Sequence, residues 1–279
     1  MRATTPSVPR ISLNSGHEIP QLGLGLFKMA EDETQRVVEQ ALELGYRHLD
    51  GARIYGNEEA VGRGIRASSI PRDELFVTTK LWREEHGRQA PHTAIDEALE
   101  RLGLDYVDLY LIHWPHPSMG LALDTWLALE EIAATGKARS IGVSNFREED
   151  LAELVAGAST LPAVNQVEIH PRFQQRALRA VQEPLGIRTE GWGPLGQGKY
   201  ELAELPALVE IAAAHGVSVP QVVLRWHLQE GVIVFPKSSR PERLRENLDV
   251  FGFELSAAQL ERIRGLDDGL RVGRDPATN

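Results

Sequence analysis

The sequence predicts a (β/α)₈ barrel, and three observations support this prediction. Short apolar runs typical of β-strands alternate with amphipathic runs typical of helices along nearly the whole chain. Eight strand-like runs can be counted, each followed by a helix, which is the pattern of such a barrel. The chain of 279 residues has an ordinary length for this fold. No linker, repeat or low-complexity segment divides it, so residues 1–279 are expected to form one domain.

The expected strands lie at Leu22–Phe27, Tyr46–Leu49, Leu75–Thr79, Tyr106–Ile112, Ala138–Val143, Ala163–Glu168, Ile187–Trp192 and Val232–Phe235. Helical patterns between them include Thr34–Leu44, Ala90–Leu102, Leu121–Ala134 and Leu205–Ala214. The first of these has an apolar stripe that Gly45 closes, as glycine often does at a helix C-terminus. Before residue 20, the short strand-like pieces Arg10–Leu13 and Glu18–Ile19 flank Asn14-Ser15-Gly16. They predict a hairpin that caps the bottom of the barrel.

A doubly wound sheet has the same alternation of strands and helices, but it should carry G-x-G-x-x-G between its first strand and helix. Three near matches occur, at Gly23–Lys28, Gly62–Ala67 and Gly191–Gly196. The first lacks the third small residue, the second follows a helix-like stretch, and the third runs into a loop that contains Pro194. The barrel is therefore the favoured fold.

The composition indicates a soluble globular protein, with 42% hydrophobic and 25% charged residues. A formal net charge of −10 argues against nucleic acid as a partner, because phosphate binding needs a basic surface. No apolar run approaches a membrane span, and residues 1–6 lack the apolar segment of a secretory signal. The chain has no cysteine, which excludes disulfides and Cys-ligated metals. A cytoplasmic enzyme that does not bind membranes is expected.

Four polar side chains, Asp50, Tyr55, Lys80 and His113, lie at or just past the ends of three of these strands. A cation within about 4–6 Å lowers the pKa of a tyrosine, so Lys80 is expected to activate Tyr55. Asp50 can keep the lysine charged, and His113 can hold a carbonyl oxygen. Each residue alone has a purely structural explanation, such as an ion pair or a loop histidine. Together they indicate a proton donor to a carbonyl oxygen.

Several longer motifs resemble the aldo-keto reductase family. They are Gly45–Asp50 with Ile54–Glu58, Asp108–Pro115, Ile141–Phe146 and Phe235–Ser238. The resemblance runs from about Arg10 to Leu266. It is strongest to bacterial members of the 2,5-diketo-D-gluconate reductase type, through Asn165–Pro171 and Gly193–Tyr200.

The resemblance implies a monomeric barrel that reduces aldehydes and ketones with NADPH. In it, Tyr55 is the general acid, Lys80 and Asp50 tune that acid, and His113 orients the carbonyl. The candidate substrates are 2,5-diketo-D-gluconate and other small carbonyl compounds. No metal site is expected, because His113 and His116 lack a third ligand.

The family pattern also assigns residues to the coenzyme. Ser144, Asn145 and Gln166 would hold the nicotinamide carboxamide, and Trp192 would stack on the ring. The following loop would contribute Gly193, Leu195 and Gln197.

The tail of the coenzyme would lie on a basic segment near the C-terminus. Ser239 and Glu242 have the spacing of a capping box, which predicts a helix start there. Lys237, Ser238 and Arg243 would bind the 2′-phosphate, so NADPH is expected over NADH. The adenine would be bordered by Glu246 and Asn247.

The substrate would contact Phe27, Trp82, His113 and Trp114. Two departures from the family pattern bear on rate and substrate range. Gly51-Ala52-Arg53 stands where family members commonly have Thr-Ala-Ala, and Gly191 stands where alanine is usual.

Two other functions remain open at this point. One is a barrel that binds NADPH as a sensor without turnover. The other is an isomerase or hydrolase that uses Asp50 and His113 and would leave Lys237 and Arg243 without a role.

Overall fold

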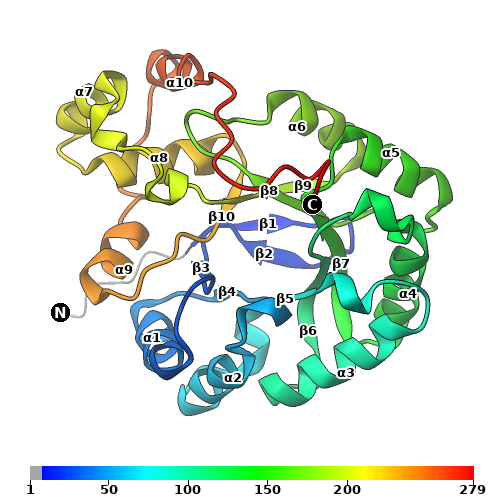
Figure 1. Cartoon of the computed structure of the whole chain (residues 1–279). Helices are drawn as coiled ribbons and strands as arrows, with labels where there is room; N and C mark the ends of the chain where they lie inside the picture. The colour runs from blue at the N-terminus through cyan, green and yellow to red at the C-terminus, as the bar shows by residue number, and fades with distance from the viewer. Residues whose placement is uncertain (1–7) are drawn as a thin grey trace.

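The fold is a closed barrel of eight parallel strands, as the sequence predicts (Figure 1). The structure is a computed structural model that describes residues 8–279, so the N-terminal segment in which no secretory signal was expected lies outside it. The strands follow one another in chain order, and a parallel bridge between Leu22 and Val234 closes the ring. They are β3 Leu24–Gly25, β4 His48–Asp50, β5 Phe76–Leu81, β6 Val107–Ile112, β7 Ala138–Ser144, β8 Val164–Glu168, β9 Arg188–Trp192 and β10 Ile233–Val234.

Helices surround the barrel and cover the outer face of the sheet (Figure 1). They are α1 Glu31–Leu44, α2 Glu58–Ala67, α3 Ala90–Leu102, α4 Ala122–Ala134, α5 Glu148–Gly157, α6 Arg176–Gln182, α7 Pro206–His215, α8 Val219–Gln229, α9 Pro241–Leu248 and α10 Ala257–Arg264. Gly45 ends α1 with a left-handed φ of 110°, a conformation that favours glycine.

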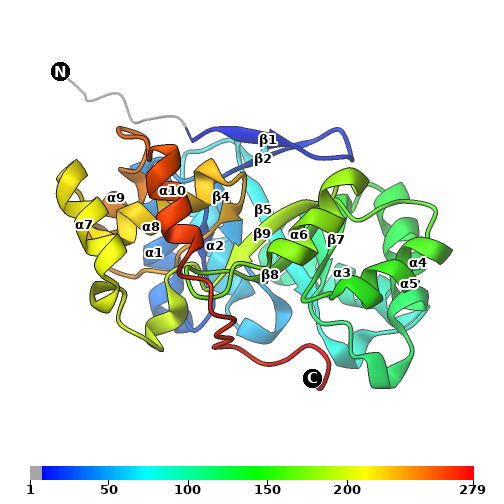
Figure 2. The same ribbon diagram turned by 90° about the horizontal axis from the view of Figure 1, so that it is seen from above.

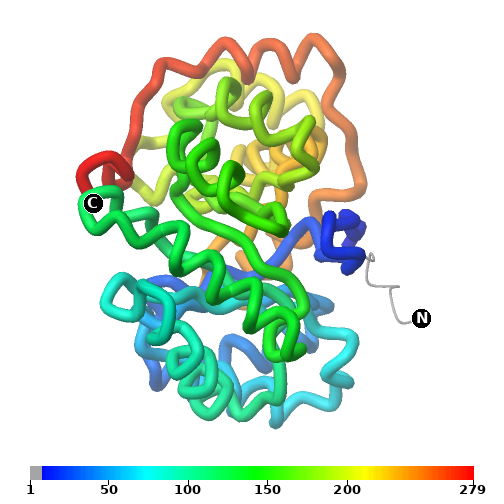
Figure 3. Tube along the Cα trace, turned by 90° about the vertical axis from the view of Figure 1, so that its right-hand side faces the viewer, coloured from blue at the N-terminus to red at the C-terminus, as the bar shows by residue number. Residues whose placement is uncertain are grey.

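The expected hairpin is present as β1 Arg10–Ser12 paired with β2 Glu18–Pro20. It lies at the end of the barrel where the strands begin, because Asn14 donates to Pro162 O and Arg188 donates to Ser12 O. Figures 2 and 3 show this hairpin at one end of the molecule and the C-terminus at the other.

The interior of the barrel is apolar near the hairpin and polar near the other end. A cluster that includes Phe76, Leu109, Leu111, Val164 and Ile233 fills the lower part. Nearer the carboxyl ends of the strands, the inward-facing side chains are charged or polar. The polar layer therefore lies at the carboxyl ends of the strands, which is where barrel enzymes place their active sites.

Residues 265–279 form a tail that returns across the mouth of the barrel (Figure 1). Leu270 donates its backbone N–H to Arg172 O, and Val272 and Gly273 donate theirs to the Glu168 carboxylate at the end of β8. No single helix among residues 8–279 is long and apolar enough to cross a membrane, and α7 with α8 passes that test only as a pair bent by 92°.

Candidate active site

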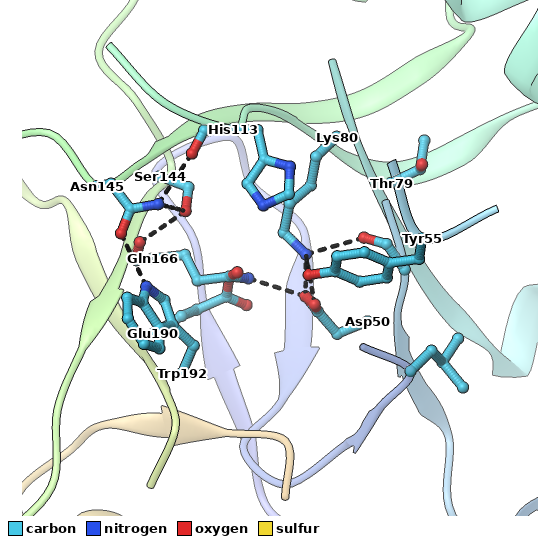
Figure 4. Close-up of polar contacts among 12 residues, drawn as sticks. Asp50, Tyr55, Thr79, Lys80, His113, Ser144, Asn145, Gln166, Glu190 and Trp192 are labelled. Carbon is cyan, nitrogen blue, oxygen red and sulfur yellow. Dashed lines mark hydrogen bonds and ion pairs between the residues drawn. The ribbon is translucent and has the colours of Figure 1, made fainter. Parts of the chain in front are cut away.

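Three neighbouring strands and one short turn bring the four predicted residues together (Figure 4). Asp50 is the last residue of β4, Lys80 lies near the end of β5, and His113 directly follows β6. Tyr55 ends a 3₁₀ turn, Arg53–Tyr55, that leaves β4 and folds back over the rim. The sequence predicted this gathering of side chains at one rim.

Lys80 lies at the centre of this group. Its ammonium group donates to both oxygens of Asp50, at 2.7 and 2.5 Å, and to Gly51 O at 2.8 Å. The Tyr55 hydroxyl lies 3.5 Å from the same nitrogen. Because a lysine ammonium has three protons, these contacts use its full donor capacity and fix its position.

The charges of this pair follow from burial and contact. Burial acts to lower the pKa of Lys80, but Asp50, Tyr55 and Glu190 together outweigh it and the pKa is raised. Burial also raises the pKa of Asp50, while its contacts with Lys80 and Gln166 oppose that rise. We therefore treat the pair as ionised, since each charge has its partner within hydrogen-bond distance.

The expectation that Lys80 would lower the pKa of Tyr55 overall is wrong for the protein without ligands. Burial of the hydroxyl raises the pKa of Tyr55, and the opposing effect of Lys80 is smaller. Asp50, which lies beyond Lys80, adds to the rise. Tyr55 is thus a neutral phenol at neutral pH, the protonation state that a proton donor needs.

His113 is held as a neutral imidazole. Burial lowers its pKa well below the usual range, and the Lys80 charge acts in the same direction. Its ring lies edge-on to the Tyr55 ring, with centroids 5.9 Å apart, and also edge-on to Trp82 at 5.2 Å. A neutral ring keeps one N–H donor, so His113 can hydrogen-bond to a carbonyl oxygen without supplying a second cation.

A second polar group continues around the rim from His113 to β9. Ser144 Oγ donates to Gln166 O at 2.8 Å, and Asn145 Nδ2 donates to His113 O at 2.9 Å. Trp192 donates its indole N–H to Asn145 Oδ1 at 2.8 Å. Hydroxyl, amide and indole groups thus meet beside the four residues around Lys80.

These groups border one cleft of about 930 Å³, a volume suited to a coenzyme and a small substrate. Phe27, Trp82 and Trp114 line it, as do Trp192, Gly193 and Gln197. The lining also includes residues that the sequence analysis did not assign, among them Lys28, Ile54, Arg83, Glu84, Lys199 and Arg274.

The structure does not place every predicted coenzyme residue on this cleft. Five of them follow β10, lie on or just before α9, and do not line the cleft: Lys237, Ser238, Arg243, Glu246 and Asn247. Lys237 and Arg243 are exposed.

Leu195 is partly buried against the hydrophobic core and is also outside the residues that line the cleft. One local expectation needs correction. A helix does start at Pro241, but Arg240 is its N-cap and Ser239 forms no capping box with Glu242. Ser238 takes part in this turn instead, since its Oγ accepts from the Arg240 N–H.

The departures at Gly51 and Arg53 leave the four residues in contact. The Gly51 carbonyl accepts from Lys80, and an added Cβ would meet Thr78 O at 3.3 Å. Arg53 points to the surface and pairs with Glu85 at 3.7 Å, so it does not separate Asp50 from Tyr55.

Gly191 is more restricted than Gly51. A Cβ there would meet Val232 at 3.1 Å and Ile169 at 3.5 Å. The neighbouring side chains therefore pack closely against the backbone of Gly191.

Two acidic residues of the site were missed by the sequence analysis. Glu190 is fully buried on β9 beside Gln166, and Glu168 holds the tail. The alternation along β9 carried a signal for Glu190, because it lies two positions before Trp192 and must face the same side. Nothing local indicated that the tail would return to Glu168.

Comparison with known proteins shows the family. Residues 21–268 match the Aldo/keto reductase family. The chain belongs to this family. It is 48% identical over 270 residues to an aldo-keto reductase of Mycolicibacterium smegmatis, covering 97% of this chain and 98% of the relative.

One further relative and one solved structure bear on function. A 2,5-diketo-D-gluconic acid reductase B from a Corynebacterium species is 48% identical, over 98% of this chain and 99% of its own. The crystal structure of a Gox0644 mutant in complex with NADPH has a TM-score of 0.93 and 46% identity, over 98% of this chain and 99% of that chain. Membership of the family confirms the resemblance that the sequence motifs indicated.

Proposed function

We propose that this protein reduces small aldehydes and ketones to alcohols with NADPH, and that Tyr55 donates the proton. The observation that carries this proposal is the buried Lys80, whose ammonium group touches the Asp50 carboxylate and lies 3.5 Å from the Tyr55 hydroxyl. A lone structural ion pair would not need a tyrosine and a neutral histidine facing the same cleft.

The residues at the cleft fit a nicotinamide coenzyme. Ser144, Asn145 and Gln166 offer hydroxyl and amide groups for the carboxamide, and the indole of Trp192 offers a face for the ring. NADPH supplies a hydride when bound. Its presence in the similar Gox0644 mutant structure supports this choice of coenzyme.

The side chains of this chain then have distinct tasks. His113 donates a hydrogen bond that orients the substrate carbonyl. Tyr55 holds the proton that the carbonyl oxygen takes up, and Lys80 stabilises the phenolate that remains. Asp50 keeps Lys80 charged in a buried place. We propose that a single chain suffices, because all these groups come from one barrel.

The substrate is a small carbonyl compound that fits between aromatic walls. 2,5-Diketo-D-gluconate is one candidate, in view of the Corynebacterium relative. A dehydrogenase named for morphine, from Pseudomonas putida, is 47% identical to this chain over 280 residues. Because two relatives with such different names are 48% and 47% identical to this chain, we infer that the walls of the cleft decide the substrate.

Replacing Tyr55 with phenylalanine tests the proposal. The variant lacks only the hydroxyl, so NADPH oxidation with a reactive aldehyde should fall by about 10²–10⁴-fold while NADPH still binds. Tyr106→Phe is the matched control, because Tyr106 lies between Arg72 and Arg139, away from the cleft. Full turnover by Tyr55→Phe would refute the role of Tyr55. A wild-type protein that binds NADPH but reduces no carbonyl would indicate a sensor.

A further inference from the structure

The interior of the barrel holds a second carboxyl group beside the pair formed by Lys80 and Asp50. Glu190 on β9 is fully buried, and it pairs in register with Gln166 on the neighbouring strand β8. Gln166 Nε2 donates to Glu190 Oε2 at 2.9 Å and to Asp50 Oδ1 at 2.9 Å (Figure 4). One amide nitrogen thus bridges two carboxyl groups.

This bridge fixes which way the Gln166 amide faces. A primary amide has two N–H hydrogens and one carbonyl oxygen, and the two carboxyl groups take both hydrogens. The reverse orientation would place the carbonyl oxygen against the Asp50 carboxylate, which can only accept, and lose that bond. Gln166 also lines the cleft, so its carbonyl oxygen is left as the acceptor for a ligand, and no group among residues 8–279 donates to it.

The protonation state of Glu190 suits a group that accepts a hydrogen bond from Gln166. Burial, together with the nearby Asp50 charge, raises the pKa of Glu190 to about 8, although Gln166 and Lys80 act in the opposite direction. The charged groups that face Glu190 are Asp50 from β4 and Lys80 from β5. Because Lys80 already neutralises Asp50, a neutral Glu190 accepts from Gln166 without adding a second anion near Tyr55.

We propose that Glu190 is a positioning residue for the reduction: it takes one hydrogen of the Gln166 amide, so that the Gln166 carbonyl oxygen faces the N–H of the nicotinamide carboxamide. The inference rests on the proposed function, because it assumes NADPH in the cleft. Glu190 itself touches neither coenzyme nor substrate and acts only through Gln166.

Two variants separate this role from simple filling of the barrel. Glu190→Met removes the acceptor and keeps the approximate size, and it should weaken NADPH binding about tenfold, the effect of one hydrogen bond. Glu190→Gln retains a carbonyl acceptor and should bind NADPH within about twofold of wild type. Quenching of tryptophan fluorescence by NADPH measures both affinities. Unchanged binding by Glu190→Met would overturn the proposal.

A double variant tests whether the effect passes through Gln166. Gln166→Met should weaken NADPH binding by itself, and adding Glu190→Met to it should cause no further loss. If the two losses add independently, Glu190 acts by another route and the proposal fails.

The pH dependence of stability, measured without coenzyme, checks the protonation state of Glu190. Because the folded protein holds a proton on Glu190 that the unfolded chain releases above pH 4.5, the stabilisation that Glu190 contributes to the wild type should fall as the pH rises from 4.5 to about 8. Glu190→Gln should lack this fall, and matching pH profiles would overturn the neutral carboxyl. This readout is independent of the proposed function, which would fail separately if the wild type did not bind NADPH or reduce any aldehyde.

Discussion

Lys80 is the residue on which the site depends most. Its ammonium group is buried and contacts Asp50, Gly51 O and Tyr55. Taking a charge out of water is costly, so this lysine is stable only while its carboxylate partner is present. The same reasoning applies to Asp50, which would be an unpaired buried anion without Lys80.

We therefore expect Lys80→Met to destabilise the protein by about 3–5 kcal/mol, because Asp50 loses its counter-charge. The double variant Asp50→Asn with Lys80→Met removes both charges and should recover part of this loss. Urea unfolding measures the stability of each variant.

Both variants should lose at least about 10²-fold in turnover, because neither can stabilise the Tyr55 phenolate. A double variant as unstable as Lys80→Met would show that charge is not the cause. A fully active Lys80→Met would contradict the proposed chemistry.

The tail is the element that completes the cleft. Val272, Gly273 and Arg274 line it, and the Gly273 Cα lies so close to Trp192 that a Cβ would meet the indole at 2.2 Å. Glu168 holds this segment by accepting from the backbone N–H groups of Val272 and Gly273, at 2.6 and 3.0 Å. Glu168 also contacts His170, which contacts the Tyr200 hydroxyl.

Glu168→Ala should release the tail from the mouth. The variant loses the two hydrogen bonds that Glu168 makes to the tail, and with them the wall that the tail forms. We therefore expect the KM for an aldehyde to rise about tenfold. Trypsin should also cleave faster after Arg271 and Arg274.

The matched control is Glu230→Ala. Glu230 pairs with Arg264 and Arg179 and supports the segment before the tail, away from the cleft. If Glu230→Ala raises the KM as much as Glu168→Ala, the effect is one of general stability.

Helix α9 is the element that should distinguish the two coenzymes. Arg243 and Arg245 are both exposed on it, and the family pattern assigns only Arg243 to the 2′-phosphate. Arg243→Ala should weaken NADPH about tenfold or more and leave NADH nearly unchanged, because an arginine–phosphate bond is lost only with NADPH. Arg245→Ala is the control, and equal weakening of both coenzymes by Arg243→Ala would refute the assignment.

For the whole molecule, the sequence predicted what depends on repeated local patterns. All eight strands lie within or next to the predicted ranges, because alternating apolar runs are local signals. The gathering of Asp50, Lys80 and His113 was predictable for a related reason, since each directly follows a predicted strand and the strand ends share one rim.

Properties that depend on distant contacts were not predictable. The direction of the Tyr55 pKa shift depends on how deeply the folded barrel buries the hydroxyl, which no neighbouring residue reveals. The bridge from Gln166 to Glu190 and Asp50 joins three strands. The effect of Arg53 depended on Glu85, which lies on another loop and draws the guanidinium to the surface.

Buried histidines should govern the stability of the whole protein in acid. His48 lies in the barrel interior next to Phe76, and His227 lies on α8 against Pro194 O. Burial lowers the pKa of each to about 3, against 6.5 in an unfolded chain. Between these values the unfolded chain binds protons that the folded protein cannot accept, so stability is lost as the pH falls from 6.5 towards 3.

Each of these histidines can contribute a slope of up to about 1.4 kcal/mol per pH unit in this window. We expect urea unfolding at pH 7, 6, 5 and 4 to show a steep loss of stability. In a variant that carries both His48→Gln and His227→Gln the slope should be clearly smaller, even if the variant is less stable at pH 7, because glutamine does not titrate. An unchanged slope in the double variant would mean that other groups, such as buried carboxylates, cause the acid unfolding.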